Sequence, residues 1–490
     1  MLFIGIDLGT SAVKLLLTDE TGRILRTVTR TYPISFPQPG WAEQEPEDWW
    51  SAVRTGVPEL LRGFDARSVA GIGAGGQMHG LVALDAAGRV LRPAILWNDG
   101  RTAEETEYLN ETVGREKLLS WTANIAFAGF TAPKLLWMRR HEPERFAALD
   151  KIMLPKDYVN YRLTGVHATD YSDASGTLLL DVRNRRWSPE MLALCGLAER
   201  CVPRLYESAE VIGTLTPESA RALGLPERVR VVAGAGDNAA AALGTGTAGE
   251  GGCNLSIGTS GTVFLSSETF RSGGDGALHA FCHADGGYHL MGCMLSAAAC
   301  NKWFCGEILG TEDYEKEQSE ITRADLGQNR VLFLPYLMGE RSPINDVRAR
   351  GTFTGLTLSS TRAELVQAVL EGVAFGIRDS LEAAKALGLT VSRSRLCGGG
   401  ARSALWRTIF ANVLGIPLDE VRTEQGPGYG GAMLAMTGCG VFPSARRAAE
   451  ALTAVSRTEE PDRALTARYE ARYAEFRLLY PAMKRVFAAL

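Results

Sequence analysis

The sequence predicts an α/β protein with two duplicated domains around a central cleft. A chain of 490 residues is too long for a single hydrophobic core and suits two large domains. Strand-like apolar runs and helix-like segments follow each other through both halves. A strand, a Gly-Thr-Ser turn and a second strand occur at the N-terminus and again around residues 258–260. This internal repeat suggests that two related halves hold a ligand between them.

The overall composition excludes several classes of protein. Hydrophobic residues make up 46% and charged residues 22%, which is the balance of an ordinary globular protein. A formal net charge of −4 offers no basic surface to nucleic acid or to an anionic membrane. Without a signal peptide or a membrane-length apolar run, and with nine scattered cysteines, we expect a cytoplasmic protein with reduced thiols.

The N-terminal segment predicts a β-hairpin suited to bind a phosphate. Apolar runs at residues 2–8 and 13–18 flank a turn that contains Thr10 and Ser11, and Asp7 stands near the end of the first run. The turn offers backbone N–H groups and two hydroxyls to an anion, while Asp7 could hold the metal ion of a phosphate. The alternative is a structural hairpin in which Asp7 only starts the turn. The second copy of the motif favours the ligand site.

The rest of the first half continues with strands and helices. We expect strands at 24–31, 69–75, 81–84, 90–96 and 228–233, and helices at 46–62, 102–119 and 157–164, with a further helix that has Pro133 in its first turn. In the polar loop expected at 169–177, a capped turn is favoured over a cleft role for Asp173 or Ser175. A glycine-rich segment at 244–252 marks the boundary between an N-terminal domain, 1–246, and a C-terminal domain, 247–490.

Three polar residues follow glycines at the end of the strand expected at 69–75. Gln77, Met78 and His79 present an amide, a thioether and an imidazole where the backbone lets a ligand approach closely. A lone histidine is more often a structural core residue. The glycine-rich loop and the neighbouring Gln77 favour a ligand role here. Trp97 stands in a second polar segment, at the next strand end.

Asp237 follows three small residues at the start of an expected helix at 239–243. A helix N-cap is a common use of aspartate and would fully explain this position. The small residues favour a further role, because they let a ligand reach the carboxylate without a side chain in the way.

The second half opens with the repeated hairpin and ends in charged sequence. We expect strands at 331–336 and from residue 395, and helices at 295–309, 364–387, 404–414 and 445–490. Three glycines at 398–400 precede a helix and suit phosphate oxygens or a nucleoside, with a purely structural turn as the alternative. His279 and His283 lack a third ligand, so no metal site is expected there.

Several motifs resemble one known family. The Ile-Gly-Ile-Asp-Leu-Gly-Thr-Ser opening, the duplicated halves and the late triple-glycine turn resemble the ribonuclease-H-like superfamily of actin, hexokinase and Hsp70. Within it, residues 129–141 and 351–371 are similar to the two signatures of the FGGY carbohydrate kinases. Residues 76–80, 96–101 and 236–240 resemble its bacterial xylulokinase branch. Glycerol kinases carry an Arg-Glu pair where this chain has Met78-His79, and an Asn where it has Ala404.

The resemblance implies a set of residue roles with ATP and Mg²⁺ as cofactors. Asp237 is the base that faces the sugar hydroxyl, and Asp7 faces Mg²⁺, directly or through water. The sugar-binding residues are Gln77, Met78, His79, Trp97, Asp237 and Asn238. The nucleotide-binding residues are Thr10, Ser11, Gly258, Thr259, Gly399, Gly400 and Ser403.

The implied reaction is phosphoryl transfer from ATP to the terminal hydroxyl of a ketopentose, with D-xylulose expected first. A ribulokinase, a gluconokinase or another polyol kinase is the alternative within the family, because few pocket side chains choose the sugar. A nucleotide-driven conformational protein like Hsp70 or actin is the alternative from another class, but such proteins lack a sugar loop. A third alternative is a sugar-binding regulator that has lost catalysis, but the presence of both Asp7 and Asp237 counts against it. The expected partners are the sugar and ATP, and a homodimer would be ordinary for the family.

Overall fold

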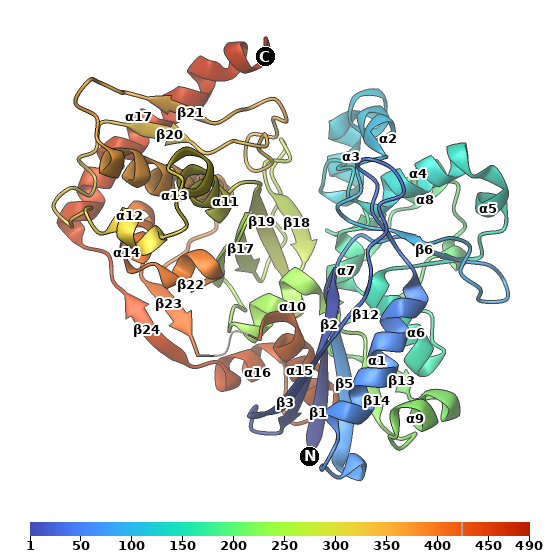
Figure 1. Cartoon of the computed structure of the whole chain (residues 1–490). Helices are drawn as coiled ribbons and strands as arrows, with labels where there is room; N and C mark the ends of the chain where they lie inside the picture. Colours follow the sequence, from blue (N-terminus) through green and yellow to red (C-terminus); the bar gives the residue numbers. More distant parts are fainter. Residues whose placement is uncertain (423–424) are drawn as a thin grey trace.

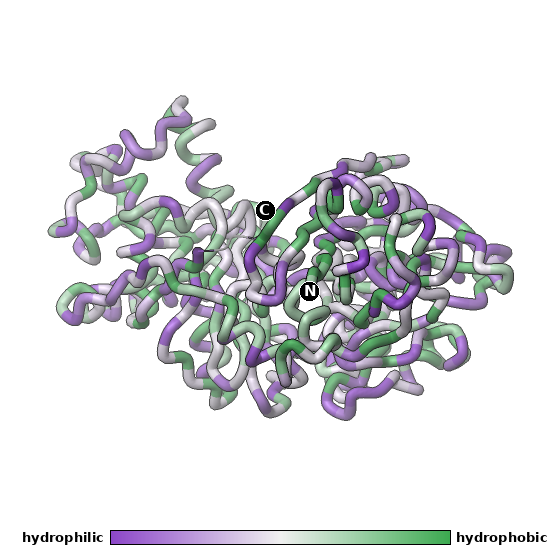
Figure 2. Tube along the Cα trace, turned by 90° about the horizontal axis from the view of Figure 1, so that it is seen from below, coloured by the Kyte–Doolittle hydropathy of each residue, from purple (hydrophilic) through white to green (hydrophobic). Residues whose placement is uncertain are grey.

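A computed structural model describes residues 1–422 and 425–490 of the chain. Each half contains one seven-stranded sheet covered by helices, and the halves stand side by side in Figure 1. This arrangement confirms the expected two-domain α/β fold. Hydrophobic and hydrophilic residues alternate at short intervals along the trace in Figure 2. Among the described residues, no helix combines the length and the apolar character needed to cross a membrane.

The first sheet is built around the N-terminal hairpin. Strands β1 (Leu2–Leu8), β2 (Ala12–Asp19) and β3 (Ile24–Thr31) form the expected antiparallel meander. On the other side, β1 pairs in parallel with β5 (Val69–Gly76), which in turn pairs in parallel with β14 (Arg230–Val232) and β15 (Ala235–Gly236). Strand β13 (Val211–Thr214) closes the edge beside β14, and helix α1 (Pro46–Leu60) packs against β2 and β3.

A set of short elements lies between β3 and β14 along the chain. Its helices are α2 (Ala103–Glu107), α3 (Arg115–Thr122), α4 (Thr131–His141), α5 (Pro143–Ala147), α6 (Pro155–Thr164), α7 (Tyr171–Ser175), α8 (Pro189–Cys195) and α9 (Pro217–Leu223). Its strands pair as β4 (Glu43–Gln44) with β7 (Ala94–Ile95), β6 (Val82–Leu84) with β8 (Lys151–Met153), β9 (Ala168–Asp170) with β12 (Arg204–Tyr206), and β10 (Leu180–Asp181) with β11 (Arg186–Trp187). In Figure 1 most of these elements stand above or beside the first sheet, while α9 lies at its lower end.

Three sequence expectations for this region are wrong. The helix expected at 102–119 contains a π-helical segment, Tyr108–Gly114, and breaks at Gly114, whose φ of 99° is outside helical geometry. The strand expected at 90–96 shrinks to Ala94–Ile95. The polar loop expected at 169–177 is instead the end of β9 and helix α7, which Asp170 caps by accepting a hydrogen bond from the Ser172 N–H.

The second sheet repeats the plan of the first. The hairpin of β16 (Cys253–Ile257) and β17 (Gly261–Ser267) pairs in parallel, through β16, with β22 (Ser394–Cys397). Strands β18 (His279–Cys282) and β19 (Tyr288–Met294) extend it on one side, and β23 (Leu418–Val421) and β24 (Val455–Glu459) on the other. The helices of this half are α11 (Ala298–Trp303), α12 (Tyr314–Gln318), α13 (Arg362–Ala386), α14 (Ala404–Leu414), α16 (Ala445–Leu452) and α17 (Arg463–Phe487), and a small pair joins β20 (Leu332–Leu334) to β21 (Thr352–Thr354).

Two helix expectations in the second half need correction. The charged stretch 445–490 is two helices separated by β24, where residues 455–459 add an edge strand to the sheet. The helix expected at 295–309 starts only at Ala298 and ends in a π-helical turn, Phe304–Ile308.

Two glycine-containing helices join the halves. Helix α15 (Gly426–Gly438) comes from the second half but packs on the first sheet, beside α10 (Asp237–Gly244), as Figure 1 shows. A Cβ added to Gly430 would lie 1.9 Å from the carbonyl oxygen of Ala240, and one added to Gly73 would lie 2.1 Å from that of Gly431. The glycines therefore let backbone meet backbone. The boundary proposed between residues 246 and 247 stays a prediction.

The contact between α10 and α15 predicts an intolerance to side chains. We expect Gly430→Ala to destabilise the protein by about 1–3 kcal/mol or more, because the new methyl group would push the helices apart. Thermal denaturation measures the effect. Gly274→Ala is the control, since no atom lies within 4 Å of the Cβ added there. Equal melting temperatures for the two variants would contradict the close contact.

Candidate active site

Two aspartates reach the same edge of the first sheet. Strand β5 lies between β1 and β15 and runs parallel to both, and Gly75 of β5 pairs with Asp7 on one side and with Ala235 on the other. Asp237 follows β15 directly. Because parallel strands end at the same edge, the two carboxyl groups come close enough for the charge of Asp7 to raise the pKa of Asp237.

The pKa values of Asp7 and Asp237 are both raised, so each carboxyl group holds its proton more strongly than it would in water. Burial, followed by the negative charge of Asp7, raises the pKa of Asp237 to about 7. Burial raises the pKa of Asp7 to about 6, against the opposing effect of Lys14. Asp237 is not the N-cap of α10, as one alternative held, but its first helical residue after Gly236. Its Oδ1 accepts the N–H of Asn238 at 2.7 Å.

The first hairpin turn is held from outside by two side chains. Trp97 donates its indole N–H to the hydroxyl oxygen of Thr10 at 2.9 Å, and Gln44 donates its amide to the Thr10 carbonyl at 2.6 Å. The Trp97 side chain remains 46% exposed, and Ser11 is exposed. The structure therefore places Trp97, expected at the sugar, against the turn expected at the phosphate.

The loop after β5 divides its three polar residues between two environments. Gln77 is buried and donates its amide to the Gln44 carboxamide oxygen at 3.0 Å, so it supports the loop from within. Met78 packs next to Gly236, and its sulfur lies 3.8 Å from the side-chain nitrogen of Asn238. Met78 and Asn238 thus stand directly beside Asp237. Sequence reasoning did not identify Gln44 as the partner of Gln77, because no local pattern links residues so far apart in the chain.

The hydrogen bonds of His79 define its protonation. Nδ1 lies 2.6 Å from the carbonyl oxygen of Gly176, and the ring stacks on Phe130 with centroids 4.7 Å apart. A carbonyl oxygen can only accept, so Nδ1 must carry a proton. Burial, with help from the nearby Lys134 charge, lowers the His79 pKa to about 3. The ring is therefore neutral, and Nε2 keeps a lone pair that can accept a hydrogen bond.

A fully buried ion cluster lies behind this loop. The ammonium group of Lys156 contacts the carboxylates of Asp157, Asp170 and Asp173 at 2.6, 2.9 and 3.4 Å. A Cβ added to Gly76 would lie 2.6 Å from that of Lys156. Asp173, one of the candidates for a cleft role, is thus buried in this cluster. Sequence reasoning missed the cluster, because nothing in the spacing brings Asp170 and Asp173 to the adjacent pair Lys156 and Asp157.

The same cluster reaches the backbone that carries Asp237. Asp170 accepts hydrogen bonds from the hydroxyls of Ser172 and Ser208 at 2.5 and 2.8 Å, and the Ser172 hydroxyl oxygen accepts the Gly236 N–H at 3.1 Å. The cluster therefore positions both the loop after β5 and the start of α10.

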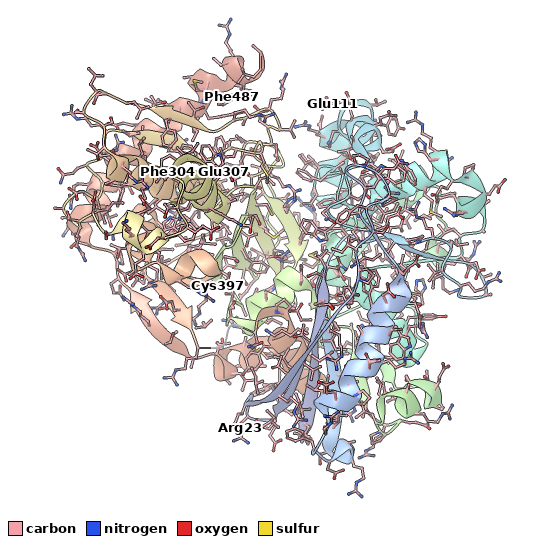
Figure 3. The ribbon with its side chains drawn as sticks, in the orientation of Figure 1. Arg23, Glu111, Phe304, Glu307, Cys397 and Phe487 are labelled. Atoms are coloured by element: carbon pink, nitrogen blue, oxygen red, sulfur yellow. The ribbon has the colours of Figure 1, made fainter. Side chains whose placement is uncertain are left out.

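Two adjoining cavities border the turns of the second half. One, of about 490 Å³, lies between α10 and the second sheet and includes Asn238, Gly258 and Gly399 in its lining. The other, of about 1120 Å³, is lined in part by Thr259, Gly399, Gly400, Ser403 and Trp303. Cys397 lines the first cavity and Glu307 lines the second, and both residues are labelled in Figure 3. Neither lining includes Thr10 or Ser11.

Ser403 has a structural use that its position beside the glycines did not reveal. Its hydroxyl oxygen accepts the Trp406 N–H at 3.1 Å, which caps α14, and its hydroxyl donates to the side-chain oxygen of Gln318 at 2.6 Å. Gly399, in contrast to Ser403, has no such structural contact among the described residues. It lines both cavities, and no atom lies within 4 Å of a Cβ added there.

Family profiles match both halves of this arrangement. The N-terminal domain of the FGGY family of carbohydrate kinases matches residues 2–244, and its C-terminal domain matches residues 253–439. The chain belongs to the FGGY family of carbohydrate kinases. This confirms the resemblance found in the sequence and makes the protein an ATP-dependent carbohydrate kinase.

Individual relatives cover the whole chain. The xylulose kinase of Escherichia coli K12 is 44% identical over 489 residues, which are 99% of this chain and 100% of the relative. A crystal structure from Brucella ovis, described as a "xyloylose kinase", is 40% identical with a TM-score of 0.93, covering 99% and 100% of the two chains. A gluconate kinase from Lactobacillus acidophilus has a TM-score of 0.94 over 100% and 99%, but at 24% identity it shows only the shared fold.

The buried cluster predicts a large loss of stability when its cation is removed. We expect Lys156→Met to cost about 3–5 kcal/mol, because it leaves buried carboxylates without a counter-charge. Lys151→Met is the matched control, since Lys151 is partly exposed and pairs with Asp150 near the surface. Thermal denaturation of both variants measures the difference. A melting temperature of Lys156→Met as high as that of the control would contradict the role of the cluster.

Proposed function

We propose that this protein transfers the γ-phosphoryl group of ATP to the terminal hydroxyl of D-xylulose and so forms D-xylulose 5-phosphate. The observation that carries the proposal is the position of the Asp237 carboxyl, next to Met78 and Asn238, at the edge of the sheet that Asp7 shares. The Escherichia coli relative, aligned along nearly the whole of both chains, is a xylulose kinase and supports this choice of sugar.

Asp237 is the general base in this proposal. Its carboxylate orients the attacking hydroxyl and takes its proton as the new bond to phosphorus forms. A carboxyl whose pKa is about 7 is a stronger base than an ordinary aspartate and is still ionised in part at neutral pH. The Asn238 N–H occupies Oδ1, which leaves Oδ2 for the substrate.

The sugar contacts follow from the same geometry. His79 offers Nε2 as an acceptor for a sugar hydroxyl, because its Nδ1 is committed to Gly176. Met78 supplies an apolar wall, and Asn238 offers an amide that can donate and accept. Gln77 supports the sugar-binding loop through its hydrogen bond to Gln44, and Trp97 supports the hairpin turn through its hydrogen bond to Thr10.

The nucleotide is bound by the turns of both halves. The Thr10–Ser11 turn and the turn with Gly258 and Thr259 offer backbone N–H groups to the phosphates. Gly399, Gly400 and Ser403 border the larger cavity, which has room for the nucleoside.

Asp7 is the residue that would hold Mg²⁺. Within the described part of the chain, burial and the Lys14 charge act on its carboxyl and no hydrogen bond does, and no group of three or more His, Cys, Asp or Glu could bind a metal ion by itself. This donor set fits Mg²⁺, which proteins commonly hold with one or two carboxylates while phosphates and water complete its shell. When bound, the ion offsets the negative charge of the outer phosphates.

The choice of sugar predicts a ranking of acceptors. In a coupled assay of ADP release we expect D-xylulose to give the highest kcat/KM among D-xylulose, D- and L-ribulose, gluconate and glycerol. The fold alone does not decide this ranking, because the gluconate kinase shares it. A higher kcat/KM for any other acceptor would replace D-xylulose in the proposal and leave the kinase assignment in place.

The role of Asp237 predicts a loss of turnover without a loss of sugar binding. We expect Asp237→Asn to lower kcat by about 10²- to 10⁴-fold, because the amide cannot take the proton. Calorimetric titration with D-xylulose should give an affinity close to that of the wild type. Asp150→Asn, which changes an acid paired with Lys151, is the control. An Asp237→Asn enzyme with wild-type turnover would remove the assignment.

A further inference from the structure

A loop of the second half reaches the aromatic cluster beside His79. The loop joins β20 to β21, and three contacts fix its centre. One side-chain oxygen of Glu340 accepts the N–H groups of Leu295 and Arg341, at 2.9 and 2.7 Å. The Ser342 N–H donates to the carbonyl of Cys293 on β19 at 3.0 Å. The backbone of Arg341 is therefore held firmly on the second sheet.

The Arg341 side chain crosses to the first half. Its guanidinium lies over the ring of Phe127, 4.8 Å from the centroid. Phe127 contacts Phe130, and Phe130 stacks on His79. Burial is the main cause that lowers the pKa of His79 and of His279, and the positive charge of Arg341 adds to the effect at both rings.

The same side chain lies close to the region of Asp237. Burial raises the pKa of the Cys293 thiol, the Arg341 charge opposes this, and the Asp237 charge adds to it. Cys293 is therefore within electrostatic reach of both Arg341 and Asp237. Arg341, contributed by the second half of the chain, thus reaches the Phe127–Phe130–His79 cluster of the first half, and its charge also acts on the thiol that the Asp237 charge influences.

Arg341 keeps hydrogen-bond donors for a ligand. In the structure of residues 1–422 and 425–490, none of the ion pairs includes this guanidinium, and its side chain is only partly buried. Its neighbours include the Phe127 ring, the Cys293 thiol, which is a weak hydrogen-bond acceptor, and the Glu340 carboxylate, whose pKa burial raises and the Arg341 charge lowers without an ion pair between them. A guanidinium carries five N–H donors, and these neighbours leave some of them for a ligand.

We propose that Arg341 is a specificity-determining residue that binds the ketone end of the acceptor sugar. The guanidinium only donates hydrogen bonds and a ketone oxygen only accepts them, while Nε2 of His79 accepts from a hydroxyl. Together, Arg341 and His79 match a carbonyl that stands next to a hydroxyl, as in a 1-hydroxy-2-ketone. This inference rests on the proposed function, since it assigns the end of the sugar that lies away from the reacting hydroxyl.

Arg341→Gln and Arg341→Lys test the inference. We expect Arg341→Gln to raise the KM for D-xylulose by about 10- to 100-fold, because the variant loses a hydrogen bond from a charged group to the sugar. The KM for ATP should change by less than about two-fold, because ATP does not contact this residue in the proposal. Arg341→Lys should recover part of the loss. The preference for D-xylulose over xylitol and D-arabitol, which lack the carbonyl, should fall in Arg341→Gln. Arg348→Gln, which changes an exposed arginine of the same loop, is the control.

Two outcomes would overturn the inference. One is an Arg341→Gln enzyme with the KM for D-xylulose and the ketose preference of the wild type. The other is a variant that loses both substrates equally and melts at a lower temperature, which would show that Arg341 only supports the loop. If the wild type prefers another acceptor, the proposed sugar fails, and the KM for that acceptor in the same variants then decides the role of Arg341.

Discussion

The parallel pairing of β1, β5 and β15 is the constraint on which the site depends. Residues 7 and 237 are far apart in the sequence, and only the register of this small set of strands brings them to one edge. Asp7 pairs across the sheet with a glycine, Gly75, and glycine also precedes Asp237. The edge therefore remains open to a substrate while its two acids are withdrawn from water, which raises both pKa values.

The sequence was informative where local chemistry and repetition agree. The duplicated hairpins, the strand at 69–75 and the helix at 404–414 could be predicted because alternation, glycine turns and apolar periodicity act over short distances. The roles of Asp7, Asp237 and the nucleotide turns remain proposals. The structure brings the two acids to one sheet edge, and the turns of the second half line two cavities.

What the sequence could not supply depends on tertiary contacts. No local signal distinguishes a polar loop at 169–177 from a buried helix. Asp170 and Asp173 can be buried there only because the ammonium group of Lys156, which belongs to α6, offsets their charge. The partners of Gln77 and Trp97 are likewise remote in sequence, so the sequence did not show that these two residues, expected at the sugar, also support the loop and the turn. Arg341 carried no motif at all, since its contact with Phe127 of the first half follows from how the halves meet.

The placement of α15 has a consequence for how the chain is made. Phe3 and Val232 of the first sheet belong to the same hydrophobic cluster as Met433 and Met436 of that helix. During synthesis, α10 can cover part of this face early, but the part that packs against α15 stays uncovered until residue 438 has left the ribosome, long after the sheet's own strands have emerged. The first half can therefore be completed only when most of the second exists, and the nascent polypeptide must keep an apolar surface soluble in the interval.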